Sequence, residues 1–305
     1  MIKRTIEISS GPAKLSLKLD QMILDREGFE CVTIPCEDIG VLIIDHPAVS
    51  YTHGLINKLL ECETAIIVCD SKHLPAGLLL PMSANTLQGE RLRQQASVKV
   101  PVRKQLWKQI IQAKIRHQAQ VFGEDHPDFA KIRNLAYRVR SGDPGNVEAL
   151  ASRIYWQALF AGEKFKRLTD GGGANDLLNY GYTILRSAVA RAICASGLHP
   201  SLSLHHKNKY NSYALADDLM EPFRPMVDVR VKQLWASGRQ TIDRETKTVL
   251  LGMLTDTVKA GGTTGPFMVN LPRMTASLCQ CFAGEKKEME IPVPWNFQDT
   301  EACGS

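Results

Sequence analysis

The sequence HHKNKYNSYALADDLMEPFRP, two-thirds of the way along the chain, carries side chains that could bind a metal ion. If YALADDLM begins a helix, Asp218 and Glu221 lie three residues apart and share one helix face. The loop before that helix brings His205 or His206 toward the same place. Imidazole nitrogen and carboxylate oxygen suit Mn²⁺, and they are compatible with Mg²⁺ if waters complete the octahedron. Because Pro222 directly follows Glu221, we expect this helix segment to end there, with Glu221 at its exposed end.

Other interpretations fit the same residues. Two like charges on one helix face repel, and either a metal ion or an arginine such as Arg224 could neutralise them. A histidine in a polar loop is more often exposed to solvent than bound to metal, and an acidic pair on a helix is usually at the surface. A third ligand would have to come from another segment. Glu148 is the best candidate, because Asn146 is placed to cap its helix. A carboxylate in a first turn also stabilises the helix dipole, which explains Glu148 without a metal.

The composition is that of a soluble globular protein, since 44% of the 305 residues are hydrophobic and 23% are charged. This length is enough for about two domains. No apolar run reaches the roughly 18 residues that span a membrane, and the N-terminal MIKRTIEISS lacks the apolar core of a signal peptide. We therefore expect a cytoplasmic protein with no membrane partner. The eight cysteines form no CxxC pair, which indicates reduced structural thiols rather than a zinc site.

Positive charge is concentrated between Gln88 and Arg116, where eight Lys or Arg residues stand against one acid, Glu90. Such a run is often only a solvated helix face, but it can also follow a phosphate backbone. A second basic group lies at residues 131–140, and two basic helices in series favour the nucleic-acid interpretation. The cations of the first group that we expect to contact DNA are Arg91, Arg93, Arg103, Lys104 and Lys108.

Two kinds of pattern divide the chain, and together they predict an α+β fold. Short alternating or wholly apolar runs fill residues 1–84 and predict a small sandwich of antiparallel sheets, with one helix capped by Ser50. Helical spacing of apolar residues dominates residues 101–291 and predicts an all-helical second domain. Residues 85–100 are expected to form a basic linker, and residues 292–305 an extended tail.

Three separated segments resemble one known family. The segments NVEALASRIYW, NYGYTIL and GLHPSLSLHHKNKYNSYALADDLMEPFRP, with the strand-rich beginning, are similar to the metal-dependent DNA integrase of CRISPR adaptation. They most resemble the type II-like subtype, found beside the single-protein RNA-guided effector nuclease. The resemblance covers nearly the whole chain. It implies the metal ligands Glu148, His206 and Glu221, with Asp218 as a supporting acid that orients the histidine. Many relatives carry aspartate in place of Glu221, and His205 beside His206 leaves the histidine assignment open by one residue.

The resemblance also implies an activity and partners. A family member joins short foreign DNA (prespacers) into the CRISPR repeat array by transesterification from a 3′-hydroxyl, using Mg²⁺ or Mn²⁺. The same site acts as an endonuclease when water replaces the hydroxyl. The implied partners are double-stranded DNA and a second copy of the chain, bound through the β-rich N-terminal domain. Two such dimers would flank a dimer of a small ferredoxin-like adaptation protein, with the effector nuclease as a further partner.

Two other functions are compatible with the residues. A DNA-binding scaffold could use the acidic and histidine side chains only to stabilise its fold. A hydrolase of small phosphoesters could use the same metal. Metal-dependent turnover would exclude the scaffold, and a requirement for polynucleotide would exclude the hydrolase. The wide basic run argues against a small substrate, because one phosphate needs only one or two cations.

Overall fold

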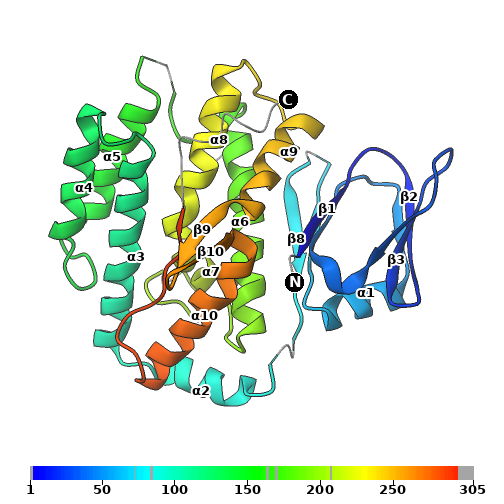
Figure 1. Ribbon diagram of the computed structural model, residues 1–305, viewed down its shortest axis with the longest axis horizontal. Helices are drawn as coiled ribbons and strands as arrows, with labels where there is room; N and C mark the ends of the chain where they lie inside the picture. The colour runs from blue at the N-terminus through cyan, green and yellow to red at the C-terminus, as the bar shows by residue number, and fades with distance from the viewer. Residues whose placement is uncertain are drawn as a thin grey trace.

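Strands fill the first part of the chain and helices most of the remainder (Figure 1), which confirms the predicted α+β class. The computed structural model describes residues 3–71, 73–82, 85–162, 165–168, 171–206 and 208–294. The elements of the strand-rich part are β1 (Arg4–Ile8), β2 (Ala13–Lys18), β3 (Gln21–Asp25), β4 (Val32–Pro35), η1 (Cys36–Asp38), β5 (Ile39–Ile44), β6 (Val49–Tyr51), α1 (His53–Glu61), β7 (Ala65–Cys69) and β8 (Pro75–Leu79).

The strand-rich part contains two four-stranded sheets, ordered β1-β5-β7-β8 and β4-β3-β2-β6. The prediction of antiparallel sheets is wrong for three strand pairs, because β1–β5, β5–β7 and β2–β6 are parallel. Helix α1 connects β5 to β7 and returns the chain to the same end of the sheet, as a parallel pair requires. The side chain of Thr52, rather than that of the predicted Ser50, caps α1 by accepting a hydrogen bond from Leu55 N.

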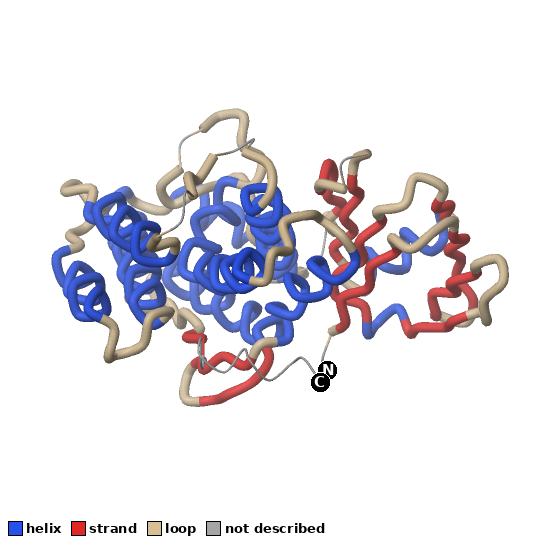
Figure 2. The backbone as a smooth tube through the Cα atoms, turned by 90° about the horizontal axis from the view of Figure 1, so that it is seen from above, coloured by secondary structure: helices blue, strands red, loops and turns tan. Residues whose placement is uncertain are grey.

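Strand β5 is buried on both faces and joins two hydrophobic cores. Val41 and Ile43 pack into the core of the helical part, whereas Leu42 and Ile44 pack between the two sheets. This alternation follows from the two-residue period of a strand. The first sheet therefore lies between the second sheet and the helices (Figure 2). Helix α6 covers this sheet through contacts with β5, β7 and β8.

The second part is mainly helical and carries the candidate site. Its helices are α2 (Gln88–Ser97), α3 (Val100–Gln120), α4 (Pro127–Arg138), α5 (Val147–Leu159), α6 (Ala174–Ala195), α7 (Ala214–Met220), η2 (Glu221–Phe223), α8 (Arg224–Ala236), α9 (Arg244–Gly252), η3 (Met253–Thr255) and α10 (Phe267–Ala283). No helix among the described residues is both long and apolar enough to span a bilayer.

The prediction that residues 101–291 are wholly helical is wrong. A three-stranded sheet packs beside α10, ordered β10 (Thr263–Pro266), β9 (Thr257–Ala260), β11 (Val293–Pro294). The glycines Gly261 and Gly262, both at positive φ, turn the chain between β9 and β10. The predicted linker at 85–100 contains helix α2, so that segment is ordered against the helices. Of the predicted tail, β11 pairs with β9, and residues 295–305 lie outside the described residues.

Candidate metal centre

The predicted helix break at Pro222 exists, but it does not expose Glu221. Helix α7 ends at Met220, and residues 221–223 form the 3₁₀ turn η2 before α8 begins. Proline lacks an N–H group and its ring disfavours a continuous helix. The prediction of an exposed end is wrong, since Glu221 is only 5% exposed. The reason is tertiary, because η2 packs against α3.

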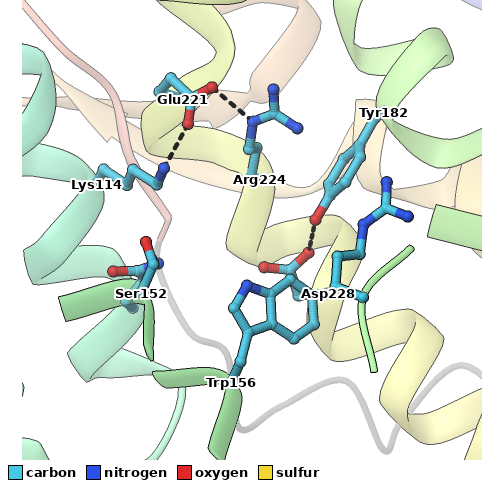
Figure 3. Close-up of a pocket in the computed structure, with 9 residues that line it drawn as sticks. Lys114, Ser152, Trp156, Tyr182, Glu221, Arg224 and Asp228 are labelled. Atoms are coloured by element: carbon cyan, nitrogen blue, oxygen red, sulfur yellow. Dashed lines mark hydrogen bonds and ion pairs between the residues drawn. The ribbon is translucent and has the colours of Figure 1, made fainter. Parts of the chain in front are cut away.

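Glu148 and Glu221 converge on one buried cation, the ammonium group of Lys114 on α3. Figure 3 shows the contacts of Glu221 with Lys114 and Arg224. Lys114 Nζ lies 2.5 Å from Glu148 Oε1 and 2.6 Å from Glu221 Oε2. Arg224 Nε donates to the other carboxylate oxygen of Glu221 at 2.8 Å. Two carboxylates that are 73 positions apart in the sequence thus hold a single positive charge between them.

The neighbouring cations decide the charge of Glu221. Burial alone would raise the pKa of this carboxyl, but Arg224 and Lys114 outweigh burial and hold the pKa at about 2. Burial opposes the charge on Lys114 as well, and Glu221 and Glu148 overcome it, so the pKa of Lys114 is raised. At neutral pH both partners are charged.

Glu148 extends toward Lys114 from the first turn of α5. The residue that caps this helix is not the predicted one. The carboxylate of Asp143 accepts hydrogen bonds from Val147 N and Glu148 N, both at 3.0 Å. Asn146 occupies the N-cap position at φ 48° and makes no side-chain capping bond. The prediction that Asn146 caps α5 is therefore wrong, because its left-handed backbone turns the chain while Asp143 supplies the acceptor.

Asp218 binds the loop that carries His205 and His206, and it does not share a partner with Glu221. Its fully buried carboxylate accepts hydrogen bonds from the backbone N–H groups of Leu204, His205 and His206, at 2.6, 2.9 and 3.3 Å. It also lies 2.5 Å from His206 Nδ1. This hydrogen bond raises the pKa of His206, and it leaves the Nε2 edge of the ring for another partner. The neighbouring Asp217 makes a separate contact and accepts a hydrogen bond from Arg186 Nε at 2.6 Å.

The two histidines make different contacts. The His205 ring stacks on Trp107 of α3, with centroids 4.2 Å apart and planes within 1°. His206 meets the same indole edge-on at 5.6 Å. Trp107 is 2% exposed and therefore fixed by its surroundings. His205 is thus engaged with Trp107, whereas His206 is engaged with Asp218, which favours His206 as the ligand.

The donor set partly fits a divalent metal ion. The carboxylates of Glu148 and Glu221 already meet at one cation. In the loop before α7, the imidazole of His206 is held by a third carboxylate, that of Asp218, as metal-binding histidines usually are. Among the described residues, however, no group of three His, Cys, Asp or Glu side chains is placed to hold a metal ion. The carboxylates of Glu148 and Glu221 come together, but the ammonium group of Lys114 lies between them. The charge of Glu221 also helps to raise the pKa of His206.

The five predicted DNA-contacting cations lie on α2 and the first half of α3. Arg93 and Lys104 are exposed, and the other three are half-buried. Arg91 Nη1 donates to the carbonyl oxygen of Ser196 at 2.6 Å, so this side chain also ties α2 to the end of α6. Arg93 and Lys104 therefore present the most accessible charge of the five.

Lys114 was counted in the basic run, but its role in the site was not predicted. The signal was present in the spacing, because Trp107, Ile111, Lys114 and Gln118 follow one another at steps of four, three and four residues. Residues at such steps share one helix face. A lysine and a glutamine on the apolar face of α3 mark a buried polar site.

A sequence model of the family "CRISPR associated protein Cas1" matches residues 6–259. The CRISPR-associated endonuclease Cas1 of Neisseria meningitidis serogroup C (strain 8013) is 42% identical over 241 residues, which cover 78% of each chain. The chain belongs to the Cas1 family. The type II-like subtype predicted from the sequence is consistent with this Neisseria relative.

Solved structures share the Cas1 fold over most of the chain. A casposase bound to integration product superposes with a TM-score of 0.74 at 18% identity, covering 99% of this chain and 94% of the casposase chain. A chain of a Cas6-RT-Cas1–Cas2 complex gives a TM-score of 0.73 at 15% identity, covering 95% of this chain and 36% of that longer one. At such low identity these similarities concern the fold.

Proposed function

We propose that this Cas1-family protein is a divalent-metal-dependent DNA endonuclease and integrase of CRISPR adaptation, which joins prespacers into the repeat array. The observation that carries the proposal is the meeting of Glu148 and Glu221 at one buried cation, beside the His206–Asp218 pair. Family membership and the integration product bound to the similar casposase support the same role.

We assign Glu148, His206 and Glu221 as the residues that would hold Mg²⁺ or Mn²⁺. Such an ion supplies charge stabilisation at the scissile phosphate and makes a bound hydroxyl or water more acidic. Asp218 fixes the ring orientation of His206 by accepting from Nδ1. Lys114 and Arg224 keep Glu221 ionised in the absence of other cations, and their own charges favour the approach of a phosphate.

The exposed face of α2 and α3 is proposed to follow a DNA backbone. Arg93, Arg103, Lys104 and Lys108 offer positive charge there, and Arg91 contributes while holding Ser196. Contacts of this kind are largely independent of base sequence and weaken as salt concentration rises. The number of cations favours polynucleotide over a small phosphoester.

The partners are proposed from the same family membership. The solved Cas6-RT-Cas1–Cas2 complex joins Cas1 to a second protein, Cas2. We propose a homodimer formed through the strand-rich part, two dimers on a dimer of the small ferredoxin-like partner, and contact with the effector nuclease. Gel filtration and light scattering of the protein with and without the partner measure these stoichiometries.

The proposed function is tested by a half-site strand-transfer assay with a 3′-hydroxyl prespacer, a repeat-containing target and Mn²⁺ or Mg²⁺. We expect joining by the native protein, none after chelation of the metal, and a loss of at least about 100-fold in the variant His206→Ala. The control variant His53→Ala removes an exposed imidazole of α1 and should keep native activity.

Undiminished joining by His206→Ala would reject the ligand assignment. Metal-independent DNA binding without any joining would favour the scaffold. Turnover of p-nitrophenyl phosphate with no joining of DNA would favour the small-phosphoester hydrolase.

A further inference from the structure

The histidine segment, residues 196–206 between α6 and α7, carries His206 and contains no helix or strand. Its course therefore depends on hydrogen bonds to other elements. On one side, Asp218 of α7 binds the backbone of the last three residues of the segment, and Leu215 N donates to the carbonyl oxygen of Pro200 at 2.7 Å. On another side lies α2, which packs against α10 at the bottom of Figure 1.

Gln95 of α2 binds the histidine segment with both polar atoms of its amide. Its Nε2 atom donates to the carbonyl oxygens of His199 and Leu202, at 3.0 and 2.9 Å, and its Oε1 atom accepts from His199 N at 2.9 Å. Gln95 is 6% exposed, and every other residue of α2 is half-buried or exposed. The most buried side chain of this helix is therefore one that binds the backbone of another segment.

Two further side chains fix α2 against the end of α6. Arg91 Nη1 donates to the carbonyl oxygen of Ser196 at 2.6 Å. Asn85 Nδ2, shortly before α2, donates to the carbonyl oxygen of Ala195 at 3.0 Å. These contacts hold the helix in place, so Gln95 extends to the histidine segment from a fixed support.

The contacts of Gln95 and Asp218 lie next to each other along the chain. Gln95 holds the carbonyl oxygen of Leu202, and Asp218 holds the N–H group of Leu204. Only Ser203 separates these two positions, and consecutive Cα atoms are a fixed distance of about 3.8 Å apart. A displacement at Leu202 therefore has to move the residues that follow it.

We propose that Gln95 is a positioning residue for His206, which fixes the backbone of the histidine segment from the side of α2. This role rests on the proposed function, because it requires His206 to be a metal ligand. Groups that orient a metal ligand without touching the metal typically change metal affinity or activity by about 10–100-fold when they are removed. Helix α2 would then support the candidate metal centre in addition to offering charge to DNA.

Trp107 reports on the histidine segment without metal, DNA or activity, because the His205 ring stacks on its indole. We label the protein with 5-fluorotryptophan and assign the Trp107 resonance in the fluorine NMR spectrum by its absence in Trp107→Phe. Gln95→Met keeps the length of the side chain and removes the amide, so we expect the Trp107 resonance to shift or broaden. The resonances of Trp156 and Trp235 should keep their native positions, which a general loss of folding would not allow.

The matched control is Gln94→Met, because the amide of Gln94 donates to Glu90 of the same helix. This control should leave all three resonances unchanged. Gln95→Glu keeps the shape of the side chain and loses both donors, so it provides a second test if Gln95→Met does not fold. A native Trp107 resonance in a folded Gln95 variant, or an equal change in Gln94→Met, would overturn the proposal.

The metal dependence of strand transfer separates positioning from general stability. We expect the Mn²⁺ concentration at half-maximal rate to rise about tenfold in Gln95→Met and to stay native in Gln94→Met. The KM for the prespacer should stay native at saturating Mn²⁺, because no cation of α2 is removed. An unchanged Mn²⁺ requirement, or a change confined to the KM, would overturn the role of Gln95.

Failure of the proposed function is recognised separately. If the native protein joins no DNA at any Mn²⁺ concentration, the integrase proposal fails, and calorimetric titration with Mn²⁺ then judges Gln95. About tenfold weaker Mn²⁺ binding by Gln95→Met than by the native protein supports the positioning role. Equal binding, or no binding by either protein, overturns it.

Discussion

At the scale of single residues, Lys114 holds the position that the two predicted carboxylate ligands share. Its ammonium group neutralises Glu148 and Glu221 in a buried setting, where an uncompensated charge is costly. A divalent ion bound between these carboxylates, as we propose, would have to displace this ammonium. Lys114 would then compete with the metal for the two glutamates.

Asp228 makes the stability of the protein depend on pH. Burial raises its pKa to about 6, although the hydroxyl groups of Tyr182 and Tyr155 oppose this shift. The unfolded chain releases this proton near pH 4 and the folded chain near pH 6. The contribution of the protonated Asp228 to the free energy of unfolding is therefore complete below about pH 4, and it is lost as the pH rises through about 6.

We expect the variant Asp228→Asn to lack this pH dependence. We compare the free energy of unfolding of the native protein with that of the variant. This difference should fall by about 3 kcal/mol between pH 4 and pH 7, because the pKa of Asp228 is roughly two units higher in the folded chain than in the unfolded chain. Denaturant unfolding across this range measures the difference. The exposed Asp125→Asn is the control, and a constant difference in Asp228→Asn would contradict the prediction.

At the scale of elements, the start of α5 decides where Glu148 points. Asp143, four residues before the helix, ties down the first two N–H groups of α5. The left-handed backbone of Asn146 turns the chain so that the Asp143 carboxylate reaches these N–H groups. A loose first turn would release Glu148 from its position beside Lys114.

We expect Asp143→Ala to destabilise the protein by about 1 kcal/mol, because two N–H groups lose their acceptor. Strand transfer should fall as well, since Glu148 loses its fixed position. Asn146→Gly is the matched control, because glycine adopts positive φ without strain, and its stability should stay within about 0.3 kcal/mol of the native value. Urea unfolding and the strand-transfer rate measure both effects, and equal behaviour of the two variants would refute the capping role.

The helices were easier to predict from the sequence than the strand pairing. The apolar spacing placed helices within residues 101–291, because helices such as α3, α5 and α6 each bury a continuous stripe. The parallel strand pairs were missed, because alternation shows that a strand is half-buried without identifying its neighbour.

At the scale of the whole molecule, a buried ion cluster joins the strand-rich part to the helices. Lys247 of α9 pairs with Asp45, at the end of β5, and lies 3.2 Å from Glu7 of β1. Lys247 and Asp45 are 3% and 5% exposed. His73 Nδ1 lies 3.1 Å from the same aspartate. This cluster helps to fix the first sheet against α9.

We expect Lys247→Met to lose about 3–5 kcal/mol of stability, because Asp45 stays buried and loses its lysine partner. The double variant Lys247→Met/Asp45→Asn removes both charges and should recover much of this loss. Denaturant unfolding, followed by both far-ultraviolet circular dichroism and tryptophan fluorescence, measures the change. A loss in the single variant below about 1 kcal/mol, or no recovery in the double variant, would contradict this role of the cluster.

The sequence by itself determined the α+β class, the helix break at Pro222 and the family resemblance, and the resemblance led us to propose Glu148, His206, Asp218 and Glu221 as site residues. The class and the helix break follow from local spacing and residue type, which are properties of short segments. Only the tertiary structure decided that Lys114 lies between the two glutamates and that Glu221 is buried. The physical reason is that these contacts join α3, α5 and η2, whose mutual packing depends on side chains far apart in the chain.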